Sequence, residues 1–316
     1  MNIVKKLFFI YIYCSLSMLF LSSCQTQDKI YLFSYFKDNG TDGLHLAYSK
    51  TGYEWHALKG DSSFLAPKVS SSKLMRDPCI IKGPDGIFRM VWTVSWTTKG
   101  VGYAFSKDLV NWSEQKLIPV MEHEDDVRNC WAPEITYDKK NKEYMIYWSS
   151  TIRGRYPLKN QMSEDEYNHR IYYVITKDFN AFTETKLLYD RGFNVIDATI
   201  HPLENKYVMF MKDETLYPSE KNIKIAYSDN LIGPYTNASK TITGNYWAEG
   251  PAAIKIKGKW IVYFDKYKEG KYGAVESNDL RSWIDISDKI SFPNGTRHGS
   301  VFRISEKELN ILLHLK

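Results

Sequence analysis

The chain has 316 residues, of which 25% are charged, and a formal net charge of +5. This mild positive charge gives no case for nucleic-acid binding, so we expect no nucleic-acid partner. No Pro/Ser-rich linker or run of like charges divides the chain after its N-terminal segment, and we expect a single domain over residues 30–316. Aromatic residues make up 15% of the chain, which favours a β-rich fold.

The first 23 residues are typical of a leader rather than of the fold. Two lysines, Lys5 and Lys6, precede an apolar stretch over residues 7–21, which is short for a membrane span of about 20 residues. We therefore interpret residues 1–23 as a secretory signal. The sequence Leu-Ser-Ser-Cys that ends at Cys24 resembles the lipobox of bacterial lipoproteins, in which the cysteine is acylated after cleavage.

The resemblance to a lipobox implies that Cys24 carries a lipid anchor and that residues 24–29 form a short tether. The protein would then lie in the bacterial cell envelope, on the periplasmic or the outer-surface side, and would meet the membrane through that anchor only. An ordinary signal with an incidental cysteine remains the alternative.

Five polar residues open apolar runs at similar intervals along the rest of the chain. They are separated by 57, 63, 52 and 49 residues. A carboxylate at the lip of a buried strand loses solvation unless something pairs with it or uses it. The spacing predicts five repeats that each aim one residue at a common centre. The five residues are Asp77, Glu134, Asp197, Glu249 and His298.

Each repeat also carries a late strand, a turn that begins with Ser or Thr, and a large aromatic or apolar residue after it. Examples are residues 45–55, 102–112 and 273–283, and alternating strands such as residues 88–93 precede these segments. Four short antiparallel strands per repeat describe a propeller blade. Since no long segment with a 3.6-residue period competes, we predict an all-β, five-bladed β-propeller.

The two ends of the domain fit closure of the ring. Residues 30–58 supply only the later strands of a blade, whereas residues 300–304 supply an inner strand without the rest. Together they would complete the fifth blade and leave no sheet edge unpaired. Cys79 and Cys130 are expected to be buried free thiols, and a disulfide between them remains the alternative.

A propeller brings the openings of its innermost strands together at the axis, even when they are far apart in sequence. Mutual repulsion and partial burial then raise the pKa of at least one of several neighbouring carboxyls. A protonated carboxylic acid beside an ionised carboxylate is the pair that glycoside hydrolysis requires.

Four motifs, each from a different repeat, resemble those of family 43 glycoside hydrolases, which are five-bladed propellers. The resemblance covers residues 30–304 and implies that Asp77 is the general base, Glu249 the general acid and Asp197 the residue that modulates the pKa of the acid. It also implies that His298 lies at the axis and holds a water or a cation such as calcium, with no other cofactor required. The motifs are Arg76-Asp77-Pro78, Asp197-Ala198, Glu249-Gly250-Pro251 and His298-Gly299-Ser300.

Other residues near these motifs are candidates for substrate binding. Trp96, Trp131 and Trp247 are placed to stack on a sugar ring, although each could instead fill a gap between blades. Glu134 is expected to shape the pocket or contact sugar. Arg297 is expected either to hydrogen-bond sugar hydroxyls or to pair with a central carboxylate. His298 completes this set.

The resemblance implies an inverting, exo-acting hydrolase that removes terminal pentose from plant cell-wall polysaccharide, as an α-L-arabinofuranosidase does. A β-xylosidase or another family 43 activity is the alternative within the family, because the shape of the loops at the mouth of the propeller decides between these activities. A non-catalytic sugar-binding lipoprotein is the alternative outside it, but such a protein is expected to lack at least one of Asp77, Asp197 and Glu249. An insertion at residues 153–167 favours exo action, and we expect a monomer that binds oligo- or polysaccharide.

Overall fold

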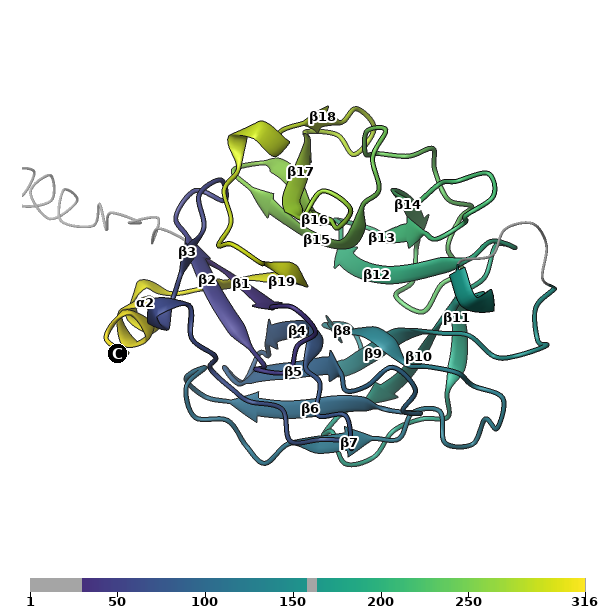
Figure 1. Ribbon diagram of the computed structural model, residues 1–316, viewed down its shortest axis with the longest axis horizontal. Coiled ribbons are helices and arrows are strands. Elements are labelled where there is room, and N and C mark those ends of the chain that lie inside the picture. The colour runs from purple at the N-terminus through teal and green to yellow at the C-terminus, as the bar shows by residue number, and fades with distance from the viewer. Residues whose placement is uncertain (1–29, 158–163, 316) are drawn as a thin grey trace, which may run out of the picture.

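Five β-sheets stand around a common axis in the computed structural model, which describes residues 30–157 and 164–315 (Figure 1). Each sheet has an inner strand, and each inner strand contacts the inner strands of the two neighbouring sheets, so that the ring is closed. The predicted five-bladed β-propeller is therefore confirmed. Blades I to V are numbered by their inner strands, which are β4 (Arg76–Lys82), β8 (Trp131–Asp138), β12 (Val195–Pro202), β15 (Glu249–Ile256) and β19 (Arg297–Ile304).

The remaining strands follow outwards from these inner strands in each blade. In blades I and II they are β5 (Phe88–Thr93), β6 (Val101–Ser106), β7 (Lys116–Ile118), β9 (Glu143–Ser150), β10 (Arg170–Thr176) and β11 (Lys186–Tyr189). In blades III and IV they are β13 (Tyr207–Asp213), β14 (Asn222–Ser228), β16 (Lys259–Lys266), β17 (Lys271–Ser277) and β18 (Ile284–Asp285). Short 3₁₀ turns are η1 (Lys59–Asp61), η2 (Glu164–Glu166) and η3 (Ser287–Lys289).

Blade V joins the two ends of the domain, as predicted. Its strand order is β19, then β1 (Ile30–Phe36), β2 (His45–Ser49) and β3 (His56–Ala57). The hydroxyl of Ser34 in β1 donates to the backbone oxygen of Pro78 in β4 at 2.6 Å, and the backbone N–H of Ile80 donates to Ser300 Oγ in β19 at 2.9 Å. These buried bonds connect the closing strands directly to blade I.

One helix was not predicted from the sequence. Helix α2 (Glu306–Leu313) follows β19 and begins with a capping box, in which Ser305 and Glu308 satisfy each other's backbone N–H groups. Leu309 and Leu312 bury its apolar side in the cluster between blades V and I. With eight residues, the helix is too short for its period to stand out in the sequence.

The core consists of five apolar clusters, one between each pair of neighbouring blades. Strand β9 shows how the sequence builds them, because alternate residues of a strand point to opposite faces. Tyr144, Ile146 and Trp148 belong to the cluster between blades I and II, whereas Met145 and Tyr147 belong to the cluster between blades II and III. A strand that is apolar on both faces therefore contributes to the clusters on both sides of its blade.

Blade III has three regular strands instead of the predicted four. The segment that would be its outer strand does bond to β14, through the backbone N–H groups of Thr236, Ser239 and Ile242. These bonds recur every three residues along the segment, whereas a strand pairs every two. The side-chain oxygens of Thr236 and Ser239 accept from the N–H groups of β14 in place of backbone carbonyls, so a regular ladder does not form.

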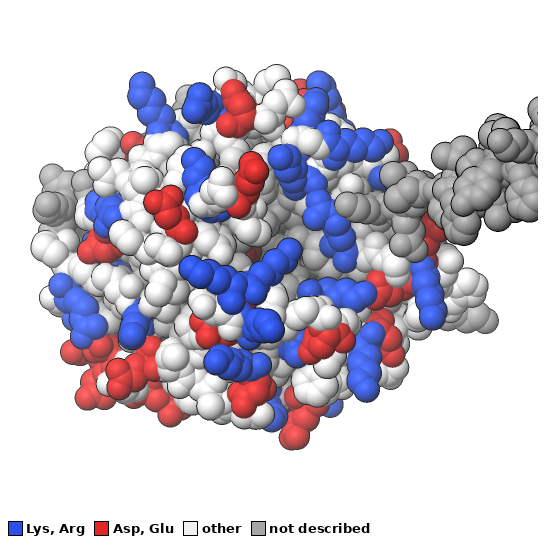
Figure 2. All heavy atoms as spheres, turned by 180° about the vertical axis from the view of Figure 1, so that it is seen from behind, with Lys and Arg blue, Asp and Glu red and all other residues white. Residues whose placement is uncertain are grey.

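The predictions about cysteines and membrane attachment have different outcomes. Cys79 and Cys130 are buried free thiols in the cluster between blades I and II, as expected. Residues 1–29, including the predicted signal and Cys24, lie outside the described residues. No helix in residues 30–157 and 164–315 is long and apolar enough to cross a membrane. Figure 2 shows basic and acidic side chains spread together over one face of the ring, consistent with the small net charge.

Because β1 and β19 close the ring, we predict that a side chain added at Gly299 in β19 strongly destabilises the fold. A Cβ atom there would lie 1.7 Å from the backbone oxygen of Ser34, so β1 would have to move away from β19. We expect Gly299→Ala to lower the free energy of unfolding by about 3 kcal/mol or more. Gly258→Ala is the control, since its Cβ meets nothing within 4 Å and only its φ of +92° is unfavourable, which costs about 1–2 kcal/mol. Urea denaturation measures the free energy of unfolding of each variant, and an equal decrease in Gly299→Ala and Gly258→Ala would contradict the prediction.

Candidate active site

Every inner strand begins with a β-bulge, in which two of its residues face one residue of the second strand. Bulges beside active sites redirect side chains. In blades I to IV the first bulge residue has a positive φ of 51°, 48°, 54° and 59°, respectively, a conformation that costs a non-glycine residue about 1–2 kcal/mol. The bulge pairs are Asp77–Pro78, Ala132–Pro133, Asp197–Ala198, Gly250–Pro251 and His298–Gly299.

The bulges show that the five polar residues are not equivalent, contrary to the expectation from their spacing. Asp77, Asp197 and His298 are the first bulge residues of blades I, III and V. Glu249 lies one residue before its bulge, and Glu134 lies one residue after its bulge pair. The structure therefore brings Asp77, Asp197 and His298 together as one layer, and it places the other two carboxyls above and below that layer.

Asp77 is only 11% exposed and is held as a carboxylate. Its Oδ2 accepts a hydrogen bond of 2.7 Å from the hydroxyl of Thr93, and its Oδ1 lies 3.3 Å from Nδ1 of His298. Burial alone would raise the pKa of Asp77, but the hydrogen bond and charge of His298, with Arg76 and Thr93, lower it to about 2. Thr93 is itself oriented by the backbone N–H of Ala132 in blade II, which donates to its hydroxyl oxygen.

His298 carries the positive charge of this layer. Nδ1 of its ring faces Asp77 at 3.3 Å and Asp197 at 4.0 Å. Burial lowers the pKa of His298, yet the charges of Asp197, Asp77 and Glu249 and the hydrogen bond to Asp77 outweigh burial and raise it to about 9. The imidazolium thus offsets two carboxyls that would otherwise repel each other on the axis.

Asp197 lies beside the candidate acid. Its Oδ2 accepts a hydrogen bond of 3.0 Å from the backbone N–H of Gly250, the residue that follows Glu249. Burial raises the pKa of Asp197 to about 6, and the charges of Glu249 and Asp77 act in the same direction against those of His298 and Lys212. This carboxyl therefore connects the layer at the axis to the strand that bears Glu249.

Glu249 differs from the other carboxyls because a cation contacts each of its oxygens. Lys212 Nζ lies 3.0 Å from Oε2, and Arg297 Nη2 lies 3.3 Å from Oε1. Its side chain is 19% exposed, against 11% for Asp77 and 8% for Asp197. The candidate acid is thus the most exposed of these three carboxyls.

Arg297 confirms one of its two predicted roles, since it pairs with a central carboxylate. It also bonds through Nε to Asp265 Oδ2 at 2.5 Å. Asp265 lies directly opposite Glu249 on the strand pair β15–β16. Burial and the charge of Glu249 raise the pKa of Asp265 to about 6, although Arg297 opposes the change.

Glu134 lies deeper along the axis than the sequence suggested. It lines a cavity of about 190 Å³ that is bordered by the inner strands of all five blades and contains Cys79, Thr199 and Ser300 but none of the first bulge residues. Its Oε2 accepts a hydrogen bond of 3.0 Å from the hydroxyl of Tyr147. Burial raises the pKa of Glu134 to about 7. Glu134 thus lies one step deeper than the layer of Asp77, Asp197 and His298, although the charges of His298 and Asp197 still act on it.

Trp96 and Trp131 form an aromatic corner beside Asp77. Their ring centroids are 5.5 Å apart in an edge-to-face arrangement, and the indole N–H of Trp131 donates to the backbone oxygen of Trp96. The guanidinium of Arg76 lies 4.5 Å from the ring of Trp96, which is 45% exposed. An exposed ring next to polar groups is suited to stacking on a sugar.

Trp247 lies apart from this corner, two residues before Glu249. It borders an open cavity of about 470 Å³, together with hydroxyl side chains such as Thr241 and Thr243. Lys221 and Lys268 lie 5.4 Å and 4.8 Å from its ring centroid. The structure therefore places Trp247 in different surroundings from Trp96 and Trp131.

Sequence reasoning missed the residues of the second strands that complete the site. Thr93, Lys212 and Asp265 each lie directly opposite the residue that precedes a bulge, in blades I, III and IV. A signal for them exists, because each is a polar residue at or next to the end of an apolar strand, as in residues 207–213. Their pairing with the site residues depends on strand register, which the sequence does not specify.

A metal ion bound by side chains does not fit the site as described. Residues 30–157 and 164–315 contain no group of three or more His, Cys, Asp or Glu side chains that could hold one. His298 bears its charge between two carboxylates, and a protonated imidazole donates hydrogen bonds instead of ligating a cation. We therefore derive no chemical step through a metal, and a cation held near His298 through water remains a prediction.

The sequence matches known proteins over different lengths. Residues 27–310 match a family model, related to glycoside hydrolase family 43, that is described as a probable glycosyl hydrolase domain. A curated α-L-arabinofuranosidase from Bifidobacterium longum subsp. longum is 30% identical over 182 residues. That match includes 51% of this chain, and it spans 16% of the length of the curated relative.

Solved structures share the fold at low sequence identity. A thermostable family-43 glycoside hydrolase has a TM-score of 0.55 at 19% identity, with 71% of this chain and 78% of that chain covered. The catalytic domain of a family-62 α-L-arabinofuranosidase from Coprinopsis cinerea has a TM-score of 0.53 at 12% identity, with 75% and 76% covered. These likenesses show the fold alone. The family model, which matches nearly the whole propeller, shows that the chain belongs to the glycosyl hydrolase domains related to family 43.

Proposed function

We propose that this protein is an inverting, exo-acting glycosidase that removes terminal pentose from plant cell-wall polysaccharide, as an α-L-arabinofuranosidase. Asp77 activates the attacking water as general base, Glu249 protonates the leaving oxygen as general acid, and Asp197 modulates that acid. The observation that carries the proposal is that Asp77, held by His298 and Thr93, shares the centre of the ring with the more exposed carboxyl of Glu249.

The arrangement of the blades supports inversion. Asp77 belongs to blade I and Glu249 to blade IV, and the contacts between inner strands place blade V between them on one side. Carboxyls on non-adjacent strands approach the axis from different directions, which leaves room for a sugar and a water between them. An inverting hydrolase requires that room, whereas a retaining one brings its two carboxyls closer together.

The choice of a pentose substrate rests on the curated arabinofuranosidase relative, and exo action rests on the insertion in blade II. In the described part of that insertion, the ring of Tyr167 lies 4.7 Å from the ring of Trp131, and the guanidinium of Arg128 lies 4.0 Å from the ring of Tyr167. The described part of the insertion thus lies next to the aromatic corner, and we expect it to restrict access to the site from that side.

A β-xylosidase is the second candidate, because the fold also occurs in proteins that act on other sugars. The first experiment compares sugar release from nitrophenyl α-L-arabinofuranoside and nitrophenyl β-D-xyloside. We expect kcat/KM to be at least about tenfold higher for the arabinofuranoside, in keeping with the contrast that one well-placed polar contact provides. The opposite ranking would select the xylosidase, and no release from either, or from arabinan, would favour a sugar-binding protein.

We also propose that the protein is a monomer and that an acylated Cys24 attaches it to the bacterial cell envelope. The motif that ends at Cys24 supports this attachment, as does a polysaccharide substrate that is too large to cross a membrane. Labelling with palmitate should mark the wild-type protein but not Cys24→Ala, and label on the variant would contradict the assignment.

The role of Glu249 can be tested through the leaving group. Glu249→Gln should reduce kcat on polysaccharide by about 10²–10⁴-fold, the usual contribution of general acid catalysis. It should reduce kcat much less on a dinitrophenyl glycoside, because an activated leaving group needs little protonation. Equal losses on both substrates would remove Glu249 from the acid role.

The stereochemical course tests the pair of Asp77 and Glu249 together. Proton NMR of the first-formed product should show the anomer opposite to that of the substrate, before mutarotation mixes the two. Asp77→Asn should abolish turnover of every substrate, activated or not, because the attacking water loses its base. Retention of configuration would mean that Asp77 acts as a nucleophile.

A further inference from the structure

Lys212 occupies an unusual position for a lysine. Only 2% of its side chain is exposed, although a buried ammonium loses the solvation that stabilises it. Its Nζ lies 2.6 Å from Glu214 Oε2 and 3.0 Å from Glu249 Oε2, so that one cation joins the candidate acid to a second carboxylate, whose side chain is 12% exposed. Lys221 contacts the other oxygen of Glu214.

These contacts keep Lys212 charged and fixed. Burial alone would lower its pKa, but the charges of Glu214 and Glu249, and then those of Tyr267 and Asp197, raise it well above the usual range. The ring of Tyr267 lies 4.6 Å from Nζ and covers the ammonium from another side. A cation with two carboxylate partners and an aromatic neighbour has little freedom to move.

We propose that Lys212 is a positioning residue for Glu249, and that Glu214 anchors it. The ammonium fixes the orientation of the carboxyl through Oε2 and holds a positive charge 3.0 Å from it. Glu214 controls how much of that charge Glu249 experiences. This inference rests on the proposed role of Glu249 as general acid.

Arg297 does not make Lys212 redundant. Arg297 contacts the other oxygen, Oε1, at 3.3 Å and makes its shorter bond of 2.5 Å to Asp265. It is also 32% exposed, whereas Lys212 is 2% exposed, so a bound sugar can displace Arg297 from Glu249 while Lys212 stays. The charged or titratable groups that face Glu249 from the neighbouring elements are Lys212, Arg297, Asp265, Asp197, His298, Tyr267 and Tyr272.

The test is the pH–rate profile of Lys212→Met. Methionine keeps the length of the side chain but removes the positive charge 3.0 Å from Glu249 Oε2. An opposite charge at this distance favours the ionised carboxyl by about 1–3 pH units, so its loss should move the alkaline limb to higher pH by about one unit or more. The kcat on a poor leaving group should also fall by about tenfold or more, and the fall should be smaller on an activated one.

Glu214→Gln should move the alkaline limb of the pH–rate profile in the opposite direction to Lys212→Met. It removes a negative charge behind Lys212 and leaves the ammonium to act on Glu249 alone, so the alkaline limb should move to lower pH. A change in the same direction is expected for Asp197→Asn, which removes a negative charge beside Glu249. A general loss of folding cannot produce limb movements of opposite sign in Lys212→Met and Glu214→Gln.

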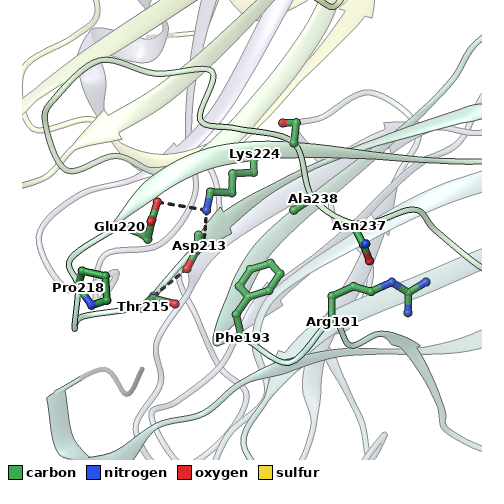
Figure 3. Close-up of a pocket in the computed structure, with 10 residues that line it drawn as sticks. Arg191, Phe193, Asp213, Thr215, Pro218, Glu220, Lys224, Asn237 and Ala238 are labelled. Carbon is green, nitrogen blue, oxygen red and sulfur yellow. Dashed lines mark hydrogen bonds and ion pairs between the residues drawn. The ribbon is translucent and has the colours of Figure 1, made fainter. Parts of the chain in front are cut away.

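Lys224→Met is the matched control. Lys224 lies on the next strand of blade III, is 15% exposed and pairs with Asp213 at 2.6 Å and Glu220 at 3.1 Å (Figure 3). It has the same number of carboxylate partners as Lys212 but no contact with Glu249. The alkaline limb of this variant should not move. Lys212→Arg, which keeps the charge, should restore the wild-type limb at least in part.

Two outcomes would overturn the inference, and they are distinguishable. If Glu249→Gln shows the leaving-group signature but neither Lys212→Met nor Glu214→Gln moves the limb, Lys212 only stabilises the fold. If Glu249→Gln lacks that signature, the acid assignment itself is wrong and the inference falls with it. Should Lys212→Met not fold, as judged by circular dichroism, the limb of Glu214→Gln decides alone.

Discussion

The structure depends on keeping a negative charge buried at the centre of the ring. Asp77 is ionised with a side chain that is 11% exposed, and removing a carboxylate from water costs several kcal/mol unless it is paired and hydrogen-bonded. His298 provides the pairing, and Thr93 provides a hydrogen bond. Thr93 belongs to blade I and His298 to blade V, so the charge of Asp77 is stabilised in this way only when the two blades are closed against each other.

Closure and chemistry are therefore linked in the same strands. His298 is the second residue of β19, and the hydroxyls of Ser34 and Ser300, which lie 2.9 Å apart, join β1, β19 and β4 within a few residues of it. The approach between β1 and β19 is so close at Gly299 that no side chain fits there. A chain that failed to close blade V would leave Asp77 without its counter-charge, even if blades I to IV were formed.

The sequence allowed prediction of the propeller and of the residues that its motifs mark. Asp77, Asp197 and His298 occupy equivalent places in the bulges, as repeats aimed at a common centre require. Spacing did not reveal that Glu134 and Glu249 lie below and above that layer, because intervals that vary by several residues cannot locate a bulge. The sequence did not predict the contact between Lys212 and Glu249 either, because it joins blade III to blade IV and depends on the strand register within each blade. The irregular edge of blade III also followed from hydroxyl side chains whose bonds a pattern of apolar residues does not predict.

The one-residue offset of Glu249 separates the properties that a base and an acid need. A general base works best as a rigid, ionised group, and the bulge places Asp77, the proposed base, against His298 with only 11% of its side chain exposed. A general acid must gain and release a proton in each cycle and must reach the leaving oxygen, so it benefits from exposure and from contacts that can change. One position before its bulge, Glu249 has the more exposed side chain and meets two cations, one fixed in the core and one at the rim. Under the proposed roles, a shift of one residue relative to the bulge, together with the longer side chain of glutamate, gives the two carboxyls different surroundings.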